Sequence, residues 1–190
     1  MIACSPETGL IDAGEWQNRE TAMKTLSDRF RHWYNHERDC NAKVLVMLES
    51  VPAAQRSQPD FQRAVDLMAH MVAARRMWLF RLGHGPEPPS GWSPAGTTFG
   101  DLPAMLSAVE ANWVAYLRDL NDEMLSRELI WKGTDGSRWQ WPVEKILTQV
   151  SCHAWYHRGQ IVVLVGALGG KTTSTDLIFW DRPARLDPVP

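Results

Sequence analysis

The sequence predicts an all-α protein: a four-helix bundle with a small β-hairpin inserted before the last helix. Four stretches carry apolar residues at helical spacing, Gly- and Pro-rich segments separate them, and one short stretch has strand character around an Asp-Gly pair. The 190 residues fit one domain with a sizeable core. We expect a loose tail over residues 1–14, the bundle over residues 15–182 and a Pro-rich tail over residues 183–190.

Composition excludes several classes of function. The net charge is −2 and the charged residues are interspersed, so no basic patch for nucleic acid stands out. No apolar run approaches the ~20 residues of a membrane span, and the N-terminus lacks the pattern of a secretory signal, which favours a cytoplasmic protein. Three widely spaced cysteines argue against both a disulfide framework and a thiolate metal site: Cys4, Cys40 and Cys152.

The predicted helices follow from apolar spacing and from stop signals. The first runs from about Glu15 to Ser50, either continuous or broken near its middle, and Pro52 ends it. The second covers residues 61–82 and is apolar on most sides, so it should be largely buried. The third, from about Asp101 to Asn121, carries a single apolar stripe.

Between Glu128 and Trp141 the pattern changes to two short strand-like runs that flank Asp135-Gly136. This pattern predicts a β-hairpin, which must lie against the helices because two strands alone are marginally stable. Pro142 suits the first position of a fourth helix, which should end near Gly169. The apolar segment from Thr175 to Trp180 should pack back onto the bundle.

Two histidines of the fourth helix form the strongest chemical signal. His153 and His157 are four residues apart and fall on the apolar stripe, so both should face inward on one side of the helix. Two buried imidazoles that both become charged would repel each other, whereas neutral imidazoles can share a metal ion. His70 lies in the middle of the most apolar helix and completes a predicted three-histidine metal site.

Other arrangements of these side chains stay open. His32 and His36 have the same spacing but lie among charged residues, which predicts surface histidines, with one of them joining the site as the alternative. Cys152 should point about 100° away from His153 and is expected to be a packed thiol. We assign His84, in a Gly/Pro loop, no role. A bundle without metal, whose histidines satisfy each other, is a further alternative.

The chain also resembles a known family. An apolar second helix with a central His70, a Gly-containing hairpin and the motif His153-x-x-x-His157-Arg158-Gly159-Gln160 resemble the DinB/YfiT-like family of metalloenzymes, over about residues 24–180. This resemblance implies a four-helix bundle that holds a divalent metal, usually zinc or nickel, on His70, His153 and His157. Arg158 and Gln160 match the end of the motif, where we expect them to support the site rather than bind the metal.

Two positions narrow the metal chemistry. Some related branches bind iron and have Glu two residues after the second histidine of the pair, where this chain has Gly159. Ala154 takes the place of the Glu that serves as general base in the HExxH motif of metalloproteases. The sequence therefore disfavours both an iron site and a peptidase.

Three nitrogen donors leave coordination positions open, as in a catalytic site. Hydrolysis and thiol transfer are both consistent with such a site. Members of the resembled family include transferases for low-molecular-weight thiols, so a thiol-dependent transferase acting on a small molecule is favoured over a hydrolase. Asp66, one turn before His70, is the best candidate to hydrogen-bond an imidazole, although a solvent-facing carboxylate is the simpler interpretation. Three aromatic residues are expected either to line the pocket or to pack in the core: Trp78, Trp155 and Tyr156.

A second functional class is a non-catalytic, metal-stabilised binding or stress-response module. Its exposed apolar helix faces would form the interface of a homodimer. Turnover of a thiol or hydrolytic substrate distinguishes the two classes, because only the enzyme would show it.

Overall fold

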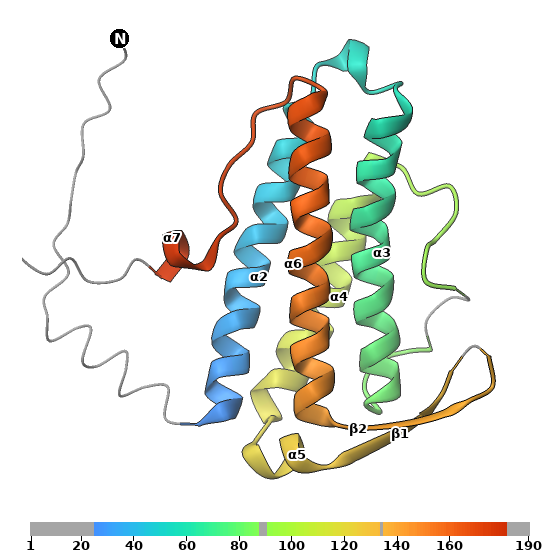
Figure 1. Cartoon of the computed structure of the whole chain (residues 1–190), viewed down its shortest axis with the longest axis vertical. Helices are drawn as coiled ribbons and strands as arrows, with labels where there is room; N and C mark the ends of the chain where they lie inside the picture. Colours follow the sequence, from blue (N-terminus) through green and yellow to red (C-terminus); the bar gives the residue numbers. More distant parts are fainter. Residues whose placement is uncertain (1–24, 88–90, 134, 182–190) are drawn as a thin grey trace, which may run out of the picture.

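The structure is a computed structural model that describes residues 25–87, 91–133 and 135–181, so the predicted tails lie outside the described residues. Four long helices run side by side in Figure 1: α2 (Leu26–Glu49), α3 (Pro59–Arg81), α4 (Leu102–Asp119) and α6 (Val143–Ala167). The shorter elements are η1 (Ala53–Gln55), η2 (Phe99–Asp101), α5 (Asp122–Ser126), α7 (Leu177–Asp181), β1 (Glu128–Lys132) and β2 (Arg138–Pro142). The predicted all-α bundle with a hairpin before its last long helix is confirmed.

The first long helix begins later than the sequence predicts. Thr25 has an extended backbone, and its hydroxyl accepts the backbone N–H of Asp28 while the Asp28 carboxylate accepts the N–H of Thr25. This reciprocal capping box fixes the start of α2 at Leu26, so a continuous helix from about Glu15 is wrong. From Leu26 to Glu49 the helix is unbroken.

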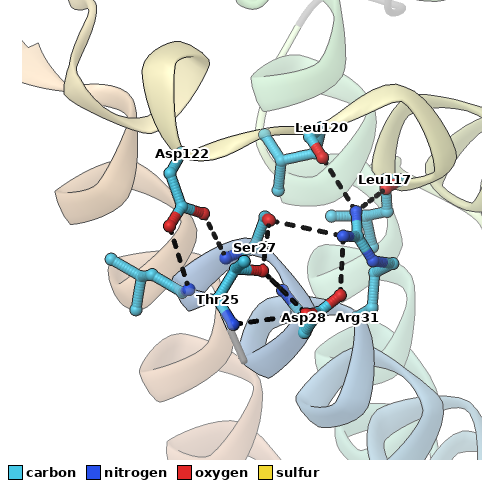
Figure 2. Close-up of polar contacts among 8 residues, drawn as sticks. Thr25, Ser27, Asp28, Arg31, Leu117, Leu120 and Asp122 are labelled. Carbon is cyan, nitrogen blue, oxygen red and sulfur yellow. Dashed lines mark hydrogen bonds and ion pairs between the residues drawn. The ribbon is translucent and has the colours of Figure 1, made fainter. Parts of the chain in front are cut away.

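Figure 2 shows how the start of α2 is tied to the end of α4 and to α5. The Asp122 carboxylate accepts two N–H groups from the first turn of α2, at 3.3 and 2.9 Å, those of Leu26 and Ser27. The Arg31 guanidinium donates to two carbonyl oxygens, each at 2.8 Å, those of Leu117 and Leu120. Because helix ends leave such backbone groups without helical partners, each of these side chains completes the end of another helix.

The core lies between the four long helices, with α6 packed against both α3 and α2. Each long helix contributes fully buried apolar side chains, for example Val44, Met68, Trp113 and Ile161. One ion pair lies among them, between Arg75 of α3 and Glu37 of α2, which are 7% and 2% exposed. Within the described ranges, no helix has the length and apolar character that crossing a membrane requires.

The hairpin pairs β1 with β2 in antiparallel register, with Trp131 opposite Trp139. Gly136 has a φ of 84° in the connecting turn, a left-handed conformation that glycine adopts without strain. The Trp131 ring meets the Trp78 ring of α3 edge-on at 5.3 Å, so the hairpin lies against the helices as expected. Pro142 ends β2 and is the N-cap of α6 rather than its first residue.

The segment after α6 returns along α2 and ends in α7, as predicted for the stretch from Thr175 to Trp180 (Figure 1). The Trp180 ring lies 5.0 Å from the His32 ring and 5.5 Å from the His36 ring. His32 Nε2 lies 2.7 Å from a carboxylate oxygen of Asp181. This part of α2 is therefore covered by a segment more than a hundred residues later in the chain.

Candidate metal centre

The three predicted histidines come together between α3 and α6. His70 lies near the middle of α3, and His153 and His157 lie one turn apart on α6. Their ring centroids are 4.9 Å apart for His70 and His153, 4.9 Å for His70 and His157, and 4.4 Å for the two α6 histidines. One nitrogen from each ring lies within 4.8 Å of the other two, and all three residues are half-buried.

Hydrogen bonds show that Nδ1 carries a hydrogen in two of these rings. His70 Nδ1 lies 2.6 Å from the main-chain carbonyl oxygen of Trp92, and His157 Nδ1 lies 2.8 Å from Oε1 of Gln160. An oxygen of either kind accepts only, so each Nδ1 must carry the hydrogen and donate it. In a neutral ring the Nε2 atom then has a free lone pair, the state in which imidazole binds a metal.

The donor set fits a divalent cation. Nε2 of His70 and Nε2 of His153 lie 3.0 Å apart, close to the ~3.3 Å between two nitrogen ligands of one tetrahedral zinc ion. Burial, followed by the neighbouring His157 and His70, lowers the pKa of His153 to about 4, so this imidazole is neutral at pH 7. A neutral His153 beside two further imidazoles suits a shared cation.

A cavity of about 170 Å³ adjoins His153 on the α3 side. Its walls include Trp78 of α3, Trp92 of the following loop and Gln149 of α6. The Arg81 guanidinium lies over the Trp78 and Trp92 rings, at 4.9 and 5.2 Å from their centroids. This stacking holds both indoles beside the histidines, so the cavity has firm aromatic walls and a small volume.

Several other predicted roles need correction. His36 is 2% exposed and not a surface residue, because α7 covers it; its Nε2 lies 3.1 Å from Sγ of Cys40. Neither His32 nor His36 belongs to the three-histidine group found in the described residues. Cys152 is exposed rather than packed, and it is not part of that group either.

Asp66 follows the simpler of its two interpretations. It is exposed and accepts a hydrogen bond at 2.8 Å from Gln62, not from His70, whose partners are Trp92, Ser93 and His153. Trp78 does line the cavity beside the histidines, whereas Trp155 lines a different pocket. Tyr156 is 65% exposed, although its ring lies 5.0 Å from that of His157.

Sequence reasoning missed the partner of His70. That partner is a main-chain oxygen in a loop, which no side-chain motif reveals. A bulky tryptophan within an otherwise Gly- and Pro-rich loop was the available signal, because Trp92 needs an apolar surface to cover its ring. The role of Gln160, by contrast, agrees with the expected supporting position behind the histidines.

The fold and the site together define the class of protein: a helical bundle with a candidate site for a divalent metal, formed by three converging imidazoles between two helices. Comparison with protein families agrees with this class. The chain belongs to the DinB family, whose family model matches residues 21–186. Neither the curated proteins nor the solved structures contain a significant match to it.

Proposed function

We propose that His70, His153 and His157 hold a divalent metal ion, zinc or nickel, and that the protein is a metal-dependent enzyme acting on a small molecule. The observation that carries this proposal is the convergence of one ring nitrogen from each of the three histidines, all within 4.8 Å of one another. Three half-buried imidazoles that converge in this way suit a shared cation. Without a metal, the His70 and His153 Nε2 atoms would share a hydrogen bond at the same 3.0 Å, which is the metal-free alternative.

The side chains around the histidines suit such a role. When bound, a divalent ion with three neutral nitrogen donors supplies Lewis-acid chemistry that makes a water or a thiol more acidic. The Trp92 carbonyl and Gln160 keep the Nδ1 hydrogens of two imidazoles engaged, which holds the Nε2 atoms toward the site. Trp78 and Trp92 form aromatic walls of the adjoining cavity, whose small volume would limit the substrate to a small group.

Within this class we favour a thiol-dependent transferase. Among the described residues no carboxylate belongs to the three-histidine group, since Asp66 is bonded to Gln62 and Glu144 is exposed, so a general base for a hydrolase is not evident. The DinB/YfiT-like resemblance supports the same choice, because that family includes transferases for low-molecular-weight thiols. The substrate would be such a thiol together with a small electrophile.

The experiment begins with elemental analysis of protein purified without an affinity tag. We expect close to one divalent metal per chain in the wild type and in the control His84→Ala, whose histidine lies exposed outside the cluster. His157→Ala should lose the metal. Full metal retention by His157→Ala would refute the metal site.

The catalytic part is tested separately, with a panel of low-molecular-weight thiols and electrophiles. Turnover that disappears on metal removal and returns on reloading supports the transferase. A chelator that lowers the melting temperature, with no turnover of any thiol or hydrolytic substrate, supports the non-catalytic metal-stabilised module instead.

A further inference from the structure

A second pocket lies on the flank of α6 that faces away from the histidines. It has a volume of about 530 Å³ and lies between α2, α6 and the segment that leads into α7. Its walls include Trp155, Arg158 and Val162 of α6. At about 100° per helical residue, these three positions are rotated by roughly 100–180° from His153 and His157, so the pocket is separate from the candidate metal centre.

Arg158 is the unusual wall residue. Its side chain is 1% exposed, and its Nε, Nη1 and Nη2 atoms have no hydrogen-bond partner within the described part of the chain. A guanidinium carries five N–H donors and accepts nothing, so burial without an acceptor costs several kcal/mol. Burial also lowers the pKa of Arg158, as expected for a charge without compensation.

Arg75 provides an internal comparison. It is buried in the same bundle, but its guanidinium pairs with Glu37 and lies over the rings of Tyr34 and Trp113. The two buried arginines thus differ in one respect: Arg75 has an anionic partner within the described chain, and Arg158 has none. Arg158 needs an anion, and the pocket that it lines has room for one that comes from outside.

The surroundings select the kind of anion. Asp176 also lines the pocket, so the wall carries one cation and one carboxylate, which disfavours a dianion such as phosphate. Trp155, Val162 and Leu177 make much of the remaining wall apolar. A planar guanidinium matches the two oxygens of a carboxylate. We propose that Arg158 binds the carboxylate of a small organic acid whose apolar body rests against Trp155 in this pocket.

The outer wall can admit such a ligand. The Arg158 nitrogens are screened from solvent, so the carboxylate reaches them only when part of the wall shifts. Residues 173–176 form the outer wall and have neither helix nor strand structure. Two contacts to sulfur hold this segment to α2: Thr173 N–H to Sδ of Met47 at 3.4 Å, and Sγ of Cys40 to the Thr175 carbonyl at 3.5 Å. The stronger bond between Lys171 and Ser50, at 2.7 Å, lies just before the segment, and His36 contacts the Thr175 backbone. Contacts to sulfur are weak, so the part between Lys171 and α7 is where the wall would move outward.

The test measures binding of benzoate by isothermal titration calorimetry on the full chain, with benzamide as a neutral ligand of the same shape. Benzoate should bind the wild type at least about tenfold more tightly than benzamide, because a hydrogen bond to a charged group contributes about 1.5–3 kcal/mol. Arg158→Met should bind both ligands equally weakly. Inorganic phosphate should bind more weakly than benzoate, and the opposite order would overturn the carboxylate assignment.

Melting temperature without ligand distinguishes a binding role from a structural one. If no group of the chain pairs with Arg158, Arg158→Met removes an unpaired buried charge and leaves the melting temperature unchanged or raised. Arg75→Met, the matched control, should lower it clearly because Glu37 loses its partner. Equal binding of benzoate and benzamide by the wild type would overturn the proposal. So would a fall in melting temperature, or a loss of folded protein, in Arg158→Met comparable to that in Arg75→Met.

Discussion

Replacing Gln160 by Leu tests whether the polar contacts behind the histidines tune the candidate metal centre. The Gln160 Oε1 atom accepts the Nδ1 hydrogen of His157 at 2.8 Å, and leucine preserves the side-chain size while removing this acceptor. Partners of this kind typically contribute 10- to 100-fold to metal affinity, about 1.4–2.7 kcal/mol. We therefore expect Gln160→Leu to weaken zinc binding by about 10- to 100-fold without abolishing it, unlike His157→Ala.

The measurement is competition between the protein and a chromophoric zinc chelator, with zinc added to metal-free protein. Gln149→Leu is the matched control, because Gln149 lies on the same helix and lines the adjoining cavity. It should retain wild-type affinity. A Gln160→Leu variant with unchanged affinity, or an equal loss in Gln149→Leu, would show that the hydrogen bond to His157 does not orient the ring.

Three further outcomes follow from groups away from this centre. Arg75→Met leaves Glu37 as an unpaired buried charge and should lower the free energy of unfolding by about 3–5 kcal/mol in urea titrations, whereas adding Glu37→Leu should restore most of it. Burial, followed by the charge of Arg158, lowers the pKa of His36, so the unfolded chain binds the extra proton more readily. The contribution of His36 to stability is therefore complete above pH 6.5 and falls as the pH decreases below that value. In thermal melts, the melting temperature of His36→Gln should fall less steeply with decreasing pH than that of the wild type. Asp122→Ala should lower the melting temperature, because it removes the acceptor for the first N–H groups of α2. Asn121→Ala serves as its control, since the Asn121 side chain caps α5 and has no bond to α2.

Most of the fold follows from local sequence signals. The apolar spacing of α3, α4 and α6 placed each helix within a few residues, and Asp135-Gly136 located the hairpin turn. The start of α2 was not predicted correctly, because Thr25 and Asp28 form their capping box within a stretch whose apolar spacing is typical of a helix. Helical spacing alone does not show such an interruption.

The candidate site was predictable to the extent that it depends on helix geometry. His153 and His157 share a face of α6 by spacing alone, and the apolar surroundings of His70 indicated that it faces inward. Contacts between distant parts of the chain were not predictable. His36 looked solvent-facing among its charged neighbours, and only the return of α7 over α2 buries it. Asp66, by contrast, has its partner on its own helix, since Gln62 lies one turn before it in α3.

The bond between His70 and the carbonyl of Trp92 affects how this centre tolerates sequence change. Since the acceptor belongs to the main chain, any residue at position 92 could supply it, provided that the loop follows the same path. Insertions or deletions near this loop should therefore disturb the imidazole more than point substitutions do. Among homologous chains, the spacing between α3 and α4 would then be a better guide to an intact centre than the identity of the residue at that position.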